Sequence, residues 1–197
     1  MRTEFYGDKR DLWKWTIALR EAGPRRKILH VPMLRPTKWP QKKPQGVDDR
    51  VWEFFTQEWK YFDERSSRCL RIAQLSDQVD VISHDFDNRN RSDYFGRVVA
   101  ALTLRPHERG LVVLLDPDTG VIGSKATEKH ISQEEVEMVW SAMRANDILM
   151  IYQHNARVEK KIWIPEKKEL IARIIGRPTS DIRVFPHSDV CFFVVAK

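Results

Sequence analysis

The sequence predicts one α/β domain over residues 1–197. We expect a three-layer sandwich in which helices cover both faces of a mostly parallel sheet that ends in an antiparallel hairpin. Two observations predict this class. Segments with apolar residues at helical spacing alternate along the chain with short apolar runs of strand length. The run Leu111–Leu115 is apolar at every position, which is typical of a strand covered on both faces in a parallel sheet.

Local signals set the expected element boundaries. Gly23-Pro24 ends the first helix, the capping box Ser132-Gln-Glu-Glu135 opens a later one, and Gly176 ends the last. The turn residues Pro186–Asp189 join two apolar runs as a hairpin. In chain order we expect a helix over 8–20, a strand over 27–34, a helix over 48–75, a strand over 79–84, a helix over 92–104, a strand from 111, a helix over 132–144, a strand over 147–152, a helix over 165–175, and hairpin strands over 182–185 and 190–195.

A basic, proline-rich loop at 35–47 follows the first expected strand. The whole formal net charge of +6 arises in the first quarter of the chain, and a basic face attracts phosphates through counterion release. We therefore expect contact with nucleic acid or a nucleotide, with Trp39 placed to stack on bases. A solvated loop that only aids solubility is the alternative. The candidate nucleic-acid-binding residues are Arg25, Arg26, Lys27, Arg35, Lys38, Trp39, Lys42, Lys43 and Arg157.

The sequence also indicates the cellular compartment of the protein. The N-terminus has no apolar core typical of a signal peptide, and no apolar run is long enough to cross a membrane, so we expect a cytoplasmic protein without a membrane partner. Cys69 and Cys191 are far apart in apolar surroundings, which favours reduced thiols over a metal site.

Three polar clusters follow expected strands: His84–Asp87, Asp116–Gly120 and Gln153–Arg157. In open parallel sheets, ligands bind outside the carboxyl ends of strands, so the coincidence of three clusters predicts a functional cleft there. The segment Leu111–Gly120 is expected to be a buried strand that delivers Asp116 and Asp118 to it. Each cluster taken alone also has the composition of an ordinary turn.

The residue types in these clusters suit several roles. Asp116 and Asp118 could share a divalent cation or position an amino group. His154 could be a general base or a metal ligand, and a structural histidine is the alternative. Arg157 could bind a phosphate or form a salt bridge. Glycine-rich dinucleotide and P-loop signatures, G-x-S-x-G and H-E-x-x-H are all absent from the sequence, which disfavours the corresponding sites.

Three motifs in order along the chain resemble those of a family of uncharacterised bacterial proteins that share F-x-G-D, F-L-D-P-D-x-G and Y-Q-H-x-x-R. Here they read Phe5-Tyr-Gly-Asp8, Leu114-Leu-Asp-Pro-Asp-Thr-Gly120 and Tyr152-Gln-His-Asn-Ala-Arg157. The resemblance spans most of the chain and brings little functional knowledge with it.

The layout of elements resembles the Rossmann-like fold of class I S-adenosylmethionine-dependent methyltransferases, which also ends in a helix and an antiparallel hairpin. Asp116-Pro117 falls where amino-methyltransferases acting on nucleic acid carry D-P-P-Y or N-P-P-Y, and Gly7–Lys14 is similar to the G-N-F-A-D-V-x-K-H start of a ribosomal-RNA adenine methyltransferase family. The resemblance implies that S-adenosylmethionine is the cofactor and that Asp116 holds the target amino group. The candidate cofactor-binding residues are Gly7, Asp8, His30 and Asp85.

Three hypotheses follow. The first is a methyltransferase-like protein that acts on or binds nucleic acid, with Asp116, Asp118 and His154 as candidate catalytic residues. The second is a metal-dependent nuclease or phosphodiesterase, in which Asp85, Asp116 and Asp118 hold Mg²⁺ or Mn²⁺ and His154 or Lys129 assists. The third is a non-catalytic binding protein on a degenerate methyltransferase fold.

Overall fold

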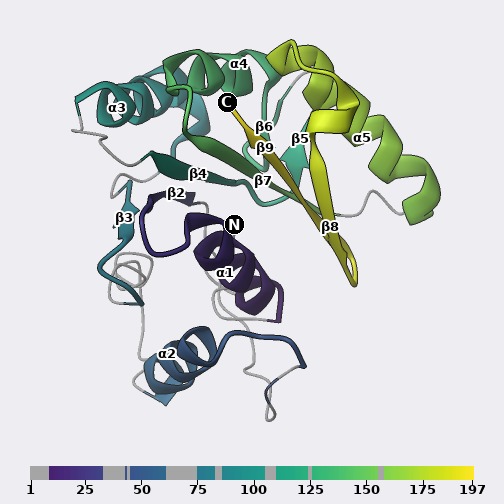
Figure 1. Ribbon diagram of the computed structural model, residues 1–197. Coiled ribbons are helices and arrows are strands. Elements are labelled where there is room, and N and C mark those ends of the chain that lie inside the picture. Colours follow the sequence, from purple (N-terminus) through teal and green to yellow (C-terminus); the bar gives the residue numbers. More distant parts are fainter. Residues whose placement is uncertain are drawn as a thin grey trace.

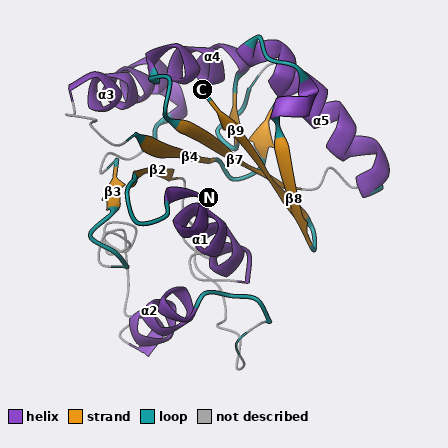
Figure 2. Ribbon diagram, in the orientation of Figure 1, coloured by secondary structure: helices purple, strands orange, loops and turns teal. Residues whose placement is uncertain are grey.

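The computed structural model has the predicted α/β architecture. It describes residues 9–32, 43, 45–60, 75–82, 86–104, 110–123, 126–154 and 158–197. One six-stranded sheet forms the middle layer; helices α1 and α2 lie on one face and α3, α4 and α5 on the other (Figure 1). Figure 2 shows the strands as one twisted layer between the two helical layers. The prediction of a three-layer sandwich is therefore confirmed.

The elements follow one another in nearly the predicted order. The helices are α1 (Lys9–Ala22), α2 (Asp49–Lys60), the short 3-10 helix η2 (Asn88–Asn90), α3 (Arg91–Leu104), α4 (Gln133–Ala142), α5 (Lys160–Ile175) and the short 3-10 helix η3 (Thr179–Asp181). The strands are β2 (Lys27–Pro32), β3 (Val79–Val81), β4 (Leu111–Asp116), β5 (Gly120–Val121), β6 (His130–Ile131), β7 (Ile148–His154), β8 (Arg183–His187) and β9 (Val190–Ala196).

Two predicted boundaries are wrong by four residues or more. Helix α5 begins at Lys160, not at Pro165, because Trp163 is buried in the first turn and anchors it to the core while the helix continues through the proline. Strand β4 ends at Asp116 instead of running to Gly120, and a turn then leads into the separate strand β5. The predicted helix over 48–75 is described only as far as Lys60.

The predicted helix caps are confirmed. The Ser132 side chain accepts a hydrogen bond from the backbone of Glu135, whose carboxylate accepts one from the backbone of Ser132 in return. Gly176 ends α5 in the left-handed conformation, at a φ of 63°.

The sheet has the strand order β3-β2-β4-β7-β9-β8. The first four strands are parallel, and β9 pairs antiparallel with both β7 and β8. In the register of β2 and β4, Pro32 lies opposite Asp116, so both strands end level with each other. We call this side of the sheet the carboxyl edge and the opposite side the amino edge.

The chain reverses its direction across the sheet between β2 and β4. From β2 it passes through α2 to β3 on one side, and from β3 it passes through α3 to β4 on the other side of β2. These two helices lie on opposite faces of the sheet (Figure 1). Such a switch point is where ligands bind in open α/β sheets, outside the carboxyl ends of the two strands.

Both faces of β4 are buried, as its uninterrupted apolar run predicts. All six of its residues are buried. Val113 and Leu115 pack in the core beneath α3, α4 and α5, whereas Val112 and Leu114 pack in the core beneath α1 and α2. Because side chains alternate along a strand, the next residue on the α1 face is Asp116.

The turn after β4 is tied to β7 by a side chain. Gln153 Oε1 accepts a hydrogen bond from the backbone of Val121, and Gln153 Nε2 donates to the Thr119 carbonyl. Gly120 has a φ of +125°, and a Cβ there would lie 2.2 Å from Gln153 Oε1, so this position requires glycine. Among the described helices, none is long and apolar enough to span a membrane.

Candidate functional site

Four charged or titratable side chains meet under α1 at the switch point. We call Asp11, Lys14, His30 and Asp116 the buried ionic cluster, because none of their side chains is more than 1% exposed. Lys14 Nζ donates to Asp11 Oδ1 at 2.5 Å and to Asp116 Oδ2 at 2.6 Å. His30 Nε2 lies 2.9 Å from the same Asp116 oxygen. One ammonium and one imidazole thus share a single carboxylate oxygen.

Simple periodicities bring this cluster together. Asp11 and Lys14 are three residues apart on α1 and therefore lie on the same face of the helix. His30 follows Ile28 by two residues on β2, and Asp116 follows Leu114 by two on β4, so both project to the α1 side of the sheet. The cluster closes when α1 packs across the ends of these two strands.

The charges in the cluster support one another. Burial disfavours the ammonium of Lys14, but the carboxylates of Asp11 and Asp116 outweigh it and raise the pKa of Lys14. Burial alone would raise the pKa of Asp116, but the charge of Lys14 and the hydrogen bond from His30 hold this pKa well below its usual range. At neutral pH Lys14 and Asp116 are therefore an ion pair removed from water.

His30 is the neutral member of the cluster. Burial lowers its pKa by more than the hydrogen bond to Asp116 raises it, so the ring is uncharged at neutral pH. Nε2 then carries the proton and donates a hydrogen bond to the Asp116 carboxylate, which leaves Nδ1 as an acceptor. The ring of Trp15 stands edge-on to the imidazole with the centroids 4.8 Å apart.

Three buried polar atoms around the cluster have no hydrogen-bond partner in the described part of the chain: Asp116 Oδ1, His30 Nδ1 and Trp15 Nε1. Each such atom costs about 1–3 kcal/mol of stability. The cluster therefore carries a cost in stability that apolar side chains at the same positions would avoid.

Asp118 does not join Asp116 in this cluster. The partners of Asp116 come from α1 and β2, whereas the charge of Asp118 acts on His130 of β6. Burial lowers the pKa of His130, Lys167 lowers it further, and Asp118 opposes both effects. Lys167 itself donates to the Val121 carbonyl at 2.8 Å. The two aspartates therefore have separate surroundings.

His154 belongs to a third group, at the tip of the β8–β9 hairpin. Its Nε2 lies 3.2 Å from Asp189 Oδ2, and Arg10 donates to both oxygens of Asp189, from Nε at 3.1 Å and from its terminal nitrogen. Partial burial would raise the pKa of Asp189, but Arg10 lowers it to about 2. This group ties α1 and the end of β7 to the hairpin.

The described part of the expected basic segment lies mostly at the other edge of the sheet. Arg25 and Arg26 precede Lys27, the first residue of β2, so they stand at the amino edge. Arg26 Nε donates to the Asn146 carbonyl at 3.4 Å, and Lys27 donates to the Asp77 carbonyl. Lys27 lies opposite Leu111, five residues before Asp116, so about 17 Å of strand separate this group from Asp116.

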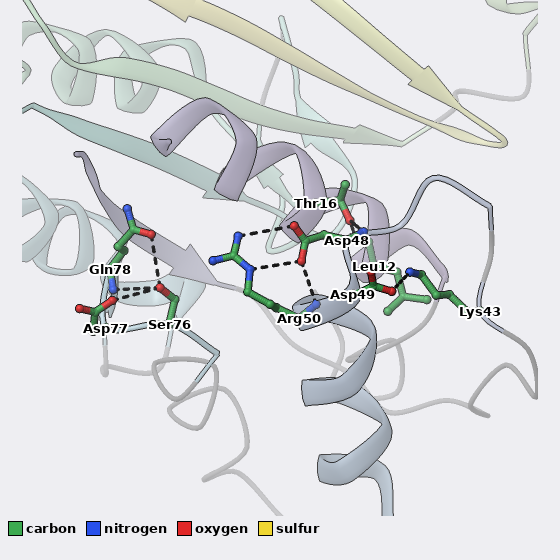
Figure 3. Close-up of polar contacts among 9 residues, drawn as sticks. All are labelled: Leu12, Thr16, Lys43, Asp48, Asp49, Arg50, Ser76, Asp77 and Gln78. Carbon is green, nitrogen blue, oxygen red and sulfur yellow. Dashed lines mark hydrogen bonds and ion pairs between the residues drawn. The ribbon is translucent and has the colours of Figure 1, made fainter. Parts of the chain in front are cut away.

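Lys43 precedes α2 in the chain and contacts its first residue, in the polar network of Figure 3. Its ammonium pairs with Asp49, while Asp48 accepts from the backbone and guanidinium of Arg50 (Figure 3). The backbone of Asp48 donates to Thr16 Oγ1 at 3.1 Å, which fastens α2 to α1. Lys43 is thus already paired within the protein.

The remaining predicted site residues lie outside the described residues. They are Gly7, Asp8, Arg35, Lys38, Trp39, Lys42, Asp85 and Arg157.

The structure adds site residues that the sequence analysis did not single out. Asp11 and Lys14 were available as a signal, since they place two charges beside the apolar stripe of the first helix that carries Leu12 and Trp15. Asp189 was expected only as a turn residue. In the described ranges, no group of three or more histidine, cysteine, aspartate or glutamate side chains is arranged to hold a metal ion.

Comparison of the sequence with protein-family models finds no match, and comparison with curated proteins finds no significant match.

Proposed function

We propose that this chain is a methyltransferase-like protein that binds nucleic acid at the carboxyl edge of its sheet, and that it does so without using Asp116 as a catalytic group. The observation that carries the proposal is the buried ionic cluster at the switch point between β2 and β4. The helix α5 and the hairpin β8–β9 at the end of the sheet are the elements that the methyltransferase resemblance implies.

The surroundings of Asp116 support a positioning role. Its side chain is 0% exposed, and Oδ2 already accepts from Lys14 and His30. A target amino group would have to reach an oxygen that α1 covers and compete with a permanent positive charge. The carboxylate instead anchors α1 across the strand ends and so shapes the edge at which we place the ligand.

The described residues do not fit S-adenosylmethionine. The atoms without partners, Asp116 Oδ1 and His30 Nδ1, lie on fully buried side chains between α1 and the sheet. Val31 near the end of β2 is buried as well. We therefore propose that the protein binds nucleic acid and does not transfer a methyl group to it.

The metal-dependent alternative is less well supported by the same geometry. Lys14 sits between the carboxylates of Asp11 and Asp116, where a divalent cation would have to displace its ammonium. The charge of Asp118 acts on His130 of β6. Carboxylates that share a metal ion must converge on one point.

The proposal is tested with the intact protein and fluorescein-labelled RNA and DNA oligonucleotides. We expect fluorescence polarisation to report binding that weakens as salt increases. Lack of binding to both nucleic acids at low salt would overturn the proposal.

Two further measurements separate it from the enzymatic hypotheses. We expect millimolar S-adenosylmethionine to leave the melting temperature unchanged, and the oligonucleotides to remain intact with Mg²⁺ or Mn²⁺. A rise in melting temperature with the cofactor would restore the methyltransferase. Cleavage that both EDTA and Asp116→Asn abolish would establish the nuclease.

A further inference from the structure

Cationic side chains from distant parts of the chain gather at the carboxyl edge around His187, the last residue of β8. His187 lies level with the end of β7, because His154 and His187 both pair with Val190. Trp13 of α1 stacks against the His187 ring with the centroids 4.5 Å apart. Lys9 lies one helical turn before Trp13, on the same side of α1.

Lys160 is the first residue of α5, which lies on the other face of the sheet from α1 (Figure 1). Burial lowers the pKa of His187, and the charges of Lys9 and Lys160 lower it further, while Asp189 opposes them. Both lysines therefore lie near enough to the imidazole for their charges to affect its pKa. Lys160 also acts on the neighbouring Cys191 thiol of β9.

These two lysines differ from the cations beside them. Lys9 and Lys160 are exposed and make no ion pair within the described residues. By contrast, Arg10 is paired with Asp189, and Lys161 lies 2.7 Å from Glu159. The first turn of α5 contains no acidic residue that would offset Lys160. Like charges gathered without counter-ions cost stability, and an anionic partner removes that cost.

We propose that Lys9 and Lys160, together with His187, form a phosphodiester-binding surface for the backbone of nucleic acid. This inference rests on the proposed function and names the residues that contact the partner. Neighbouring α1 residues link the surface to the switch point, since Arg10 holds the hairpin tip and Lys14 holds Asp116. A strand bound across Lys9 and Lys160 would therefore pass the end of the sheet that the buried ionic cluster shapes.

The test compares two double variants that each remove two positive charges. Lys9→Gln/Lys160→Gln alters the proposed surface. Arg144→Gln/Arg177→Gln is the matched control, because both arginines are exposed and lie at the amino edge, Arg144 just before β7 and Arg177 near Lys197, which bonds to Asp147. Affinity for a labelled oligonucleotide is measured by polarisation at several salt concentrations, and urea unfolding checks that each variant is folded.

We expect the Lys9/Lys160 variant to lose affinity on the order of tenfold, and the slope of log K against log salt to become shallower by about 1.8, from about 0.9 per lost phosphate contact on B-DNA and somewhat less on single strands. The Arg144/Arg177 variant should keep both values. If the wild-type protein binds but the Lys9/Lys160 variant keeps its affinity and slope, this inference fails and the proposed function stands. If the wild type does not bind, the proposed function fails. Wild-type binding to phosphatidylserine vesicles, and not to nucleic acid, would assign the surface to a membrane and overturn the inference.

Discussion

At the scale of single residues, Lys14 separates two carboxylates that would otherwise repel each other in a layer without water. Its ammonium bonds to Asp11 and Asp116, and all three side chains are buried. Removing Lys14 leaves two buried carboxylates without their shared counter-charge, and neutralising Asp116 as well leaves only one. The cluster is therefore open to a test in which a second substitution repairs the first.

We expect Lys14→Met to lower the free energy of unfolding by about 3–5 kcal/mol, the usual cost of breaking a buried ion pair. Lys14→Met/Asp116→Asn should recover part of this loss, because the amide carries no charge. Lys161→Met removes a lysine from an exposed pair with Glu159 and should stay close to wild type. Urea unfolding measures all three variants, and equal losses for Lys14→Met and Lys161→Met would contradict a buried pair.

The neutral state of His30 predicts a pH dependence. Because its pKa is lowered in the folded protein, the unfolded chain takes up a proton at higher pH than the folded protein does. The free energy of unfolding should therefore fall as the pH drops below about 6.5, by at most about 1.4 kcal/mol per pH unit for one group. Asp116 affects stability at lower pH. Because its pKa is depressed in the folded protein, its contribution to stability is complete above the usual carboxyl pKa and is lost as the pH falls below that value.

Urea titrations between about pH 7.5 and 5 check this pH dependence. His30→Gln should flatten the fall in stability. His130→Gln should keep most of it, because the pKa of His130 is lowered in the same direction but the ring is only partly buried. A wild-type profile that is flat over this interval would mean that the folded protein accepts the proton on His30.

At the scale of elements, the turn between β4 and β5 depends on the close approach of a backbone to a side chain. Gly120 leaves room for the Gln153 amide, which holds the backbone of Val121 and the carbonyl of Thr119. This contact positions the chain directly after Asp116. The structural role of Gln153 explains why a polar residue that is 2% exposed is found near the end of β7.

Gly120→Ala should lower the free energy of unfolding by about 1–3 kcal/mol, because the new methyl group meets Gln153 and the positive φ is strained for alanine. Gly96→Ala is the matched substitution in the middle of α3, where nothing lies within 4 Å of the added carbon. It should raise stability by about 0.4–1 kcal/mol. Urea unfolding distinguishes the two, and a neutral Gly120→Ala would refute the close approach.

At the scale of the whole molecule, the sequence predicts the layers better than the contacts between them. Helical spacing and the apolar run of β4 are local properties, and they suffice for the α/β class. The strand order depends on pairing between distant segments, so neither the position of β9 between β7 and β8 nor the pair β5 and β6 could be read from periodicity.

The candidate site shows the same limit. His30 and Asp116 could be marked as strand residues near the carboxyl edge, but the register of β2 and β4 and the docking of α1 decide that Lys14 reaches them both. The charge of Asp118 acts on His130 and the His154 side chain contacts Asp189, although the sequence places all three polar residues after buried strands. Charge totals could not indicate that Arg25 and Asp116 stand at opposite edges.

The link between Lys14 and Asp116 also has a consequence for the order of folding. The two residues are 102 positions apart, so the link cannot form until β2 and β4 have paired and α1 has docked across them. An ammonium loses its hydration at little net cost only when both carboxylates are already in place. We therefore expect the ionic link to form late, after the folding barrier, so that it slows unfolding and leaves the folding rate nearly unchanged.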